Sequence, residues 1–100
     1  MPCTMKAHAS EPSPEVLSRF EEALAQLSDG YVQGTFEDRP WGATIRRSAD
    51  QRRIWLYGEQ LGGTDVVSFN FYVLDTGVVL KPCEMASSKV IDFVLGFRPT

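Results

Sequence analysis

Apolar residues recur at helical spacing near the start of the chain. They fall three or four positions apart, as one face of an amphipathic helix requires: Val16, Leu17, Phe20, Ala23, Leu24 and Leu27. Ser13 is a good N-cap, and Pro14 suits the first helical position. Asp29-Gly30 is a helix-ending pair, because glycine tolerates the left-handed conformation. The pattern predicts a first helix between Ser13 and Asp29, with one buried face.

From Tyr31 onward the pattern changes to short runs rich in β-branched and aromatic residues, separated by turn-forming residues. The runs are residues 31–36, 41–47, 52–58, 66–74 and 78–81. Asp75-Thr76-Gly77 forms a turn between the last two runs, and Pro82 ends the fifth because proline has no amide donor. This order predicts a meander of five antiparallel strands.

The first three runs place their apolar residues on one face when they pair across Glu37–Pro40 and Ser48–Gln51. This pairing sets Phe36 opposite Trp41, and Ile45 opposite Ile54. The resulting apolar face consists of Val32, Phe36, Trp41, Ala43, Ile45, Ile54 and Leu56. A slip of one residue would scatter this set over both faces. The sequence therefore predicts a sheet with one buried and one polar face.

The last segment is apolar on nearly every side. Ser87 or Ser88 can cap a helix that runs to about Leu95, with Gly96 and Pro99 as stop signals. A short apolar run of this kind is also compatible with a strand. We predict an α+β two-layer sandwich: an N-terminal helix, a five-stranded antiparallel meander and a C-terminal helix, with both helices on one sheet face. Residues 1–12 are predicted to be a flexible tail, and residues 13–100 a single domain.

The composition is that of an ordinary globular domain, with 43% hydrophobic and 23% charged residues. No apolar run approaches the ~18 residues of a membrane span. Residues 1–10 lack the apolar stretch of a secretory signal. These observations predict a soluble, cytoplasmic protein without membrane contact.

Metal-ligating and redox-active residues are scarce. Cys3 and Cys83 are too few for a disulfide framework. A bridge between them is sterically possible because Cys3 lies in the tail, but nothing requires one, and we predict two free thiols in a reducing compartment. The one histidine, His8, lies in the tail, which argues against histidine-dependent catalysis and multi-histidine metal sites. No cofactor and no metal are predicted.

Three short motifs suggest catalysis only weakly. Asp75-Thr76-Gly77 resembles the signature of aspartic proteases, but that mechanism needs a second aspartate and more chain after the motif. Residues 58–64 have the glycine spacing of a phosphate-binding loop but no lysine. Cys83 has no histidine base, and the neighbouring Glu84 opposes a thiolate. We predict no catalytic residue and no enzyme.

The polar sheet face is the candidate site. The predicted pairing gives three rows, Tyr31–Arg46–Arg53, Gln33–Thr44–Trp55 and Thr35–Gly42–Tyr57, which Ser68, Asn70 and Tyr72 extend. Arg46 opposite Arg53 is unfavourable unless an anion lies nearby. Arginine beside flat rings suits stacking and anion recognition. The candidate binding residues are Tyr31, Gln33, Thr44, Arg46, Arg53, Trp55, Tyr57, Asn70 and Tyr72.

Three other interpretations of this face are open: an ordered surface on which arginine stems cover the rings, a homodimer interface, or a surface covered by the last segment. A net charge of −3 and only three lysines argue against nucleic acid. The leading hypothesis is a non-catalytic interaction module that binds a protein partner or a second copy of itself. In that case the acidic outer face of the first helix offers a complementary patch. The alternative is a nucleic acid or a small anionic ligand on the same face.

Overall fold

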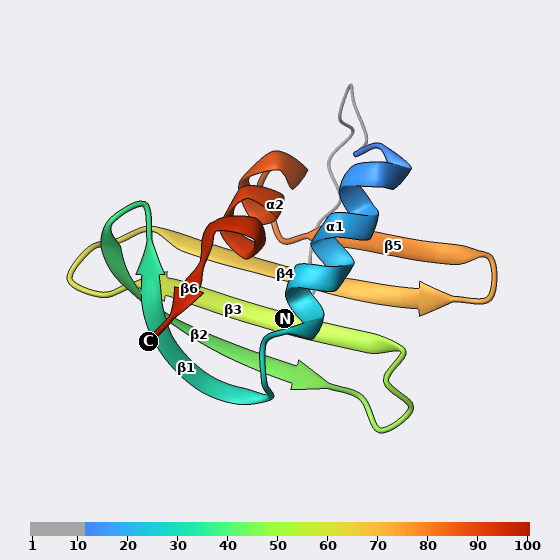
Figure 1. Ribbon diagram of the computed structural model, residues 1–100, viewed down its shortest axis with the longest axis horizontal. Coiled ribbons are helices and arrows are strands. Elements are labelled where there is room, and N and C mark those ends of the chain that lie inside the picture. The colour runs from blue at the N-terminus through green and yellow to red at the C-terminus, as the bar shows by residue number, and fades with distance from the viewer. Residues whose placement is uncertain (1–11) are drawn as a thin grey trace.

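Residues 12–100 form two helices and a six-stranded antiparallel sheet in the computed structural model (Figure 1). Residues 1–11, most of the predicted tail, lie outside the described residues. The elements are α1 (Pro14–Ala25), β1 (Gly30–Phe36), β2 (Arg39–Arg47), β3 (Arg53–Gln60), β4 (Val66–Leu74), β5 (Gly77–Pro82), α2 (Ser87–Gly96) and β6 (Arg98–Pro99). The strands lie in the order β5-β4-β3-β2-β1-β6. No helix among residues 12–100 is long and apolar enough to cross a membrane.

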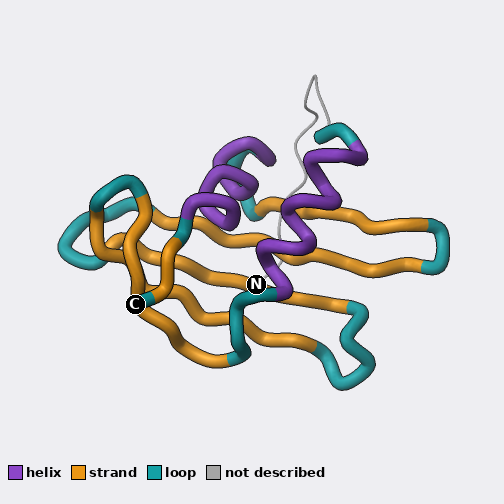
Figure 2. The backbone as a smooth tube through the Cα atoms, in the orientation of Figure 1, coloured by secondary structure: helices purple, strands orange, loops and turns teal. Residues whose placement is uncertain are grey.

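The predicted two-layer arrangement is confirmed. Both helices lie on the same face of the sheet, and β1 to β5 form a meander of neighbouring antiparallel strands (Figure 2). The sequence did not reveal β6, in which Arg98 and Pro99 pair with Thr35 and Gly34 of β1. A two-residue strand has no periodicity to detect.

The helix ends follow the sequence signals in part. The hydroxyl of Ser13 accepts a hydrogen bond of 3.2 Å from the amide of Val16, as expected for an N-cap. Helix α1 ends at Ala25, earlier than predicted. The helical interpretation of the last segment is confirmed, but its N-cap is Ala86, which makes no side-chain cap. The predicted capping by Ser87 or Ser88 is therefore wrong.

The predicted strand pairs are wrong by two residues in both of the first hairpins. The first turn consists only of Glu37 and Asp38, whose φ angles of 52° and 63° suit a tight hairpin turn. Gly34 therefore lies opposite Trp41. In the second hairpin the turn is wider than predicted, and Ile45 lies opposite Leu56. Because side chains alternate with a period of two, both shifts leave every residue on its predicted face.

The core lies between the predicted apolar face and the two helices. Phe20 of α1 packs on Phe69 and Phe71 of β4, with ring centroids 5.4 and 5.5 Å apart. Phe93 of α2 packs on Trp41, with centroids 4.9 Å apart. Helix α2 is covered on several sides, as its composition requires. Its buried residues are Val90, Ile91, Phe93 and Val94.

Candidate functional site: the outer face of the sheet

The sheet face that points away from α1 and α2 is called the outer face here. Neither described helix covers it (Figures 1 and 2). Its residues alternate with the core residues along each strand, so it carries the predicted polar and aromatic side chains. In its centre these are Thr44, Arg46, Arg53, Trp55, Tyr57, Ser68, Asn70 and Tyr72.

The corrected pairing changes the neighbours of both arginines. Arg46 lies opposite Trp55, and Arg53 lies opposite Tyr72. The predicted cross-strand pair of Arg46 and Arg53 is therefore wrong, and with it the argument that this pair requires an anion. Each arginine instead lies beside an aromatic ring, which is a favourable cross-strand neighbour.

Trp55 and Tyr57 form a flat aromatic surface on β3. Their ring centroids are 6.3 Å apart, and their planes differ by 11°. Trp55 is half-buried, and Tyr57 keeps 37% of its surface exposed. Parallel, offset rings of this kind offer an apolar platform with polar atoms at its edge.

Two cations flank the ring of Tyr72. The guanidinium carbon of Arg53 lies 6.0 Å from the ring centroid, and the ammonium nitrogen of Lys81 lies 5.5 Å from it. Arg53 also donates a hydrogen bond of 3.3 Å from Nε to Oδ1 of Asn70, which is 6% exposed. Lys81 belongs to β5 and lies opposite Asn70. Extending the predicted rows of outer-face residues from β4 to β5 would have added Lys81 to the candidate site.

The cations of the outer face have no carboxylate partner among residues 12–100. The ion pairs in this part of the chain are Arg47–Asp29, Arg52–Asp75 and Lys89–Asp65. The cationic side chains of the outer face, Arg46, Arg53 and Lys81, are not among them.

A groove of about 720 Å³ crosses the outer face from β2 to the segment that follows β5. We call it the outer groove. It is lined by Arg46, Arg53, Trp55, Tyr57, Val66, Ser68, Cys83, Glu84 and Met85. Its size lies in the range of ligand-binding clefts, and its lining mixes aromatic, apolar and charged groups.

The outer groove contains four of the predicted site residues: Arg46, Arg53, Trp55 and Tyr57. Asn70, Tyr72 and Thr44 share the face but do not line the groove, although Asn70 supports Arg53. The sequence pattern does not reveal the wall formed by residues 83–85. The amide of Cys83 donates 2.9 Å to the carbonyl oxygen of Ser68, so this segment continues beside β4 after β5 has ended.

Tyr31 and Gln33 lie apart from the groove, on β1 near the opposite edge of the sheet. The side-chain amide of Gln33 donates 3.3 Å to the hydroxyl of Tyr31. The ring of Tyr31 rests on Gly42, where an added Cβ would lie 2.2 Å from the tyrosine hydroxyl. These two predicted site residues are therefore not brought together with Trp55.

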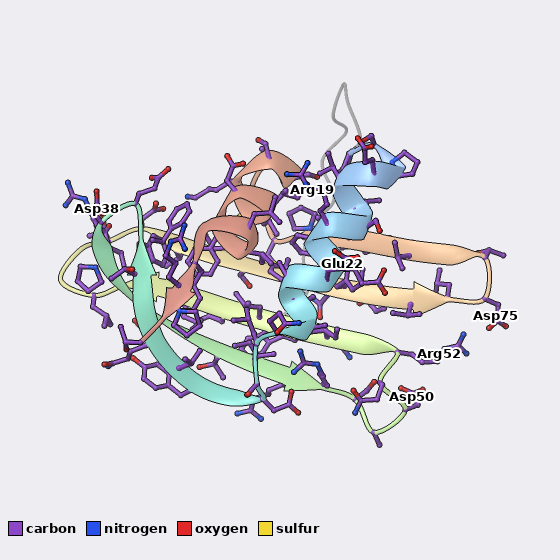
Figure 3. All side chains as sticks on the ribbon, in the orientation of Figure 1. Arg19, Glu22, Asp38, Asp50, Arg52 and Asp75 are labelled. Atoms are coloured by element: carbon purple, nitrogen blue, oxygen red, sulfur yellow. The ribbon has the colours of Figure 1, made fainter. Side chains whose placement is uncertain are left out.

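The three weak catalytic motifs have structural roles. Asp75 forms an ion pair with Arg52 across the turns at one end of the sheet (Figure 3), and Gly77 has φ 140°. Residues 61–65 form the connection between β3 and β4, and a strand follows them. No group of three His, Cys, Asp or Glu residues that could hold a metal ion occurs among residues 12–100.

Cys83 is disulfide-bonded, so the prediction of a free thiol is wrong for this residue. Cys3 lies outside the described residues. A disulfide depends on the distance between two Cβ atoms in the folded chain, which separation along the sequence does not reveal.

Comparison with protein-family models, with curated proteins and with solved structures finds no match to this chain.

Proposed function

We propose that this chain is a non-catalytic interaction module that binds a protein partner in the outer groove. One observation carries the proposal: Trp55, Tyr57 and the two arginines line one groove on a face that neither described helix covers. Trp, Tyr and Arg are the residue types enriched at protein interfaces and among the residues that contribute most to binding. Such clusters stabilise complexes because flat rings bury much area at a small entropic cost.

A protein partner fits the charges better than a nucleic acid does. The chain has a net charge of −3, so its long-range field repels a polyanion. A protein segment with one or two acidic side chains carries too little charge for this repulsion to dominate, and its acidic groups are attracted locally by Arg46 and Arg53. The aromatic pair can accept an apolar side chain of the same segment.

The groove chemistry supports binding rather than catalysis. Among its described residues the groove offers one carboxylate, on Glu84, and no histidine. Its hydroxyl groups, on Ser68 and Tyr57, have no histidine base among these residues, and Cys83 is disulfide-bonded. A nucleophile paired with a base is the arrangement that covalent catalysis needs.

The experiment is site-specific photo-crosslinking in the cell of origin. A photoreactive phenylalanine analogue replaces Tyr57 in one protein, and Glu22 on helix α1 (Figure 3) in a second protein as control. The proposal expects a crosslinked protein at position 57, absent at position 22, that is lost in Arg46→Ala/Arg53→Ala. The pair Arg19→Ala/Arg39→Ala changes the net charge equally on exposed residues outside the groove and should preserve the crosslink.

Two measurements identify other occupants. Light scattering at low and high salt tests for a second copy, and a dimer lost in Trp55→Ala would identify that copy as the partner. Salt-dependent binding of a labelled single-stranded oligonucleotide, lost in Arg46→Ala/Arg53→Ala, would replace the proposal with nucleic-acid binding. Equal crosslinking at positions 57 and 22 would contradict a specific groove.

The cytoplasmic location stays a prediction from the sequence. The disulfide at Cys83 weighs against it, because disulfides persist mainly in oxidising compartments. Alkylation of thiols at the moment of lysis, followed by mass spectrometry, distinguishes a reducing from an oxidising compartment. An alkylated Cys83 supports a reducing compartment.

A further inference from the structure

The two ends of the outer groove carry opposite charges. Arg46 and Arg53 lie on β2 and β3, whereas Glu84 lies at the other end, just after β5. Glu84 is exposed and forms no ion pair with residues 12–100. Its φ of 57° is unusual for a residue with a side chain, and the backbone bends here instead of continuing as a regular strand.

No described cation neutralises the Glu84 end. Lys81 lies two positions before Cys83 on the same face, but its ammonium group leans over Tyr72, on the side away from Glu84. Lys89 donates 2.6 Å to Asp65. The negative end of the groove is therefore as available to a ligand as the positive end.

The length of the groove sets the spacing of the charges that it can recognise. The row Thr44–Tyr57–Ser68–Cys83 crosses the sheet from β2 to the extension of β5, and Arg46 lies two residues along β2 from this row. Three strand spacings across and two residues along amount to about 16 Å. An extended peptide advances by about 3.3 Å per residue, so about five residues bridge the two ends. The stacked rings of Trp55 and Tyr57 lie between them.

We propose that the outer groove recognises an extended segment with an acidic residue at one end, a basic residue about four to five positions away and an apolar residue between them. The acidic side chain meets Arg46 and Arg53, the apolar one lies on Trp55 and Tyr57, and the basic one meets Glu84. This inference rests on the proposed function and names the chemistry of the partner. A uniformly acidic segment fits less well because Glu84 repels its second carboxylate.

The test uses the full chain and four capped pentapeptides. They are Asp-Ser-Leu-Ser-Lys, the same peptide with Asp at both ends, with Lys at both ends and with Ser at both ends. Binding is followed up to millimolar concentration by the indole N–H resonance of Trp55 in two-dimensional NMR spectra. The indole of the buried Trp41 serves as the internal reference.

We expect the mixed peptide to bind about threefold more tightly than the diacidic one at low salt, the size of effect typical of exposed charge pairs. Glu84→Lys should reverse this preference by about the same factor. Glu22→Lys makes the same charge change on helix α1 and should leave the preference unaltered. High salt should reduce all of these differences.

The outcomes separate the two proposals. Binding of all peptides without preference, or an equal change in Glu84→Lys and Glu22→Lys, overturns the charge polarity and leaves the groove as a binding site. If no peptide moves the Trp55 resonance, the proposed function fails together with this inference. Displacement of a bound peptide by higher concentrations of the protein itself identifies a second copy as the occupant and overturns the inference.

Discussion

The guanidinium of Arg47 donates a hydrogen bond of 2.8 Å to the carbonyl oxygen of Leu27. It also donates 3.0 Å to the carbonyl oxygen of Leu24 and forms an ion pair with Asp29. Arg47 lies on β2, faces the helices, and its side chain is 13% exposed. The carbonyl oxygens at a helix end lack intrahelical donors and attract cations. Helix α1 has no basic residue in its own last turn, so a residue of the sheet takes this role.

Arg47→Met should therefore lower the free energy of unfolding by about 2–4 kcal/mol, because it removes charge-assisted hydrogen bonds from a partly buried site. Urea unfolding followed by circular dichroism measures the change. Arg46→Met is the matched control, since Arg46 is exposed on the outer face and should cost no more than about 0.5 kcal/mol. Equal losses in the two variants would contradict the proposed anchoring of α1.

Gly34 and Gly42 are buried strand glycines that respond differently to an added methyl group. A Cβ at Gly34 would lie 2.3 Å from the carbonyl oxygen of Arg98, which is backbone and cannot swing aside. At Gly42 the obstacle is the side chain of Tyr31, which is 58% exposed and can turn towards solvent at the cost of its hydrogen bond from Gln33. Gly34→Ala should cost about 1–3 kcal/mol and release β6 from β1.

Gly42→Ala should cost less than about 1 kcal/mol, because only a mobile ring is displaced. Hydrogen exchange of the amide of Thr100, which donates 3.0 Å to the carbonyl oxygen of Gln33, follows the attachment of β6. Faster exchange of this amide in Gly42→Ala than in Gly34→Ala would contradict the prediction that a methyl group at Gly34 detaches β6 from β1.

The two tryptophans have different roles, and their substitution should lower the stability by different amounts. Trp41 is 3% exposed and packs on Phe93 in the core, so Trp41→Ala should cost about 3–5 kcal/mol. Trp55 is half-buried on the outer face, and Trp55→Ala should cost about 1 kcal/mol while it weakens peptide binding. Thermal unfolding measures the two losses of stability. Acrylamide quenching compares the exposure of the two rings, because Trp55→Phe leaves only Trp41 to fluoresce and Trp41→Phe leaves only Trp55. Stronger quenching of Trp41 than of Trp55 would contradict the assigned layers.

Asp65 and Lys89 connect the loop before β4 to helix α2. The ammonium group of Lys89 donates 2.6 Å to Oδ1 of Asp65 and lowers the pKa of this carboxyl below its ordinary value of 3.8, although burial opposes the shift. Lys89→Met should raise this pKa towards 3.8, as measured by carboxyl ¹³C titration. Lys81→Met, whose ammonium lies over Tyr72, is the control and should leave the pKa of Asp65 unchanged.

The same pair predicts the pH dependence of stability. Because the pKa of Asp65 is lower in the folded state, the pair stabilises the fold above pH 3.8. This contribution is lost as the pH falls from 3.8 through the lower folded value. Both side chains are more than 40% exposed, so the effect is at most about 1 kcal/mol and decreases with salt. A stability difference between wild type and Lys89→Met that grows as the pH falls would contradict this sign.

The sequence by itself determined which residues lie on each layer. The helical spacing from Val16 to Leu27 defines the buried face of the first helix, and the alternation within the strands separates the core residues from the outer face. These predictions survived two errors in strand pairing because a shift of two residues preserves the face of every side chain. For the same reason, Arg46, Arg53, Trp55 and Tyr57 were found together on the outer face.

Only the tertiary structure decided which of these residues are neighbours. In the tight turn, Glu37 and Asp38 both adopt the left-handed backbone conformation. Glycine is the residue type that predicts this conformation strongly, and neither position has one. That turn and the wider second one set the pairing that places Arg46 beside Trp55. Glu84 enters the groove because the chain continues beside β4 after Pro82, a path fixed by one backbone hydrogen bond to Ser68. Alternation along a strand is a local property of the chain, whereas contact across strands depends on turns and distant segments that the pattern does not encode.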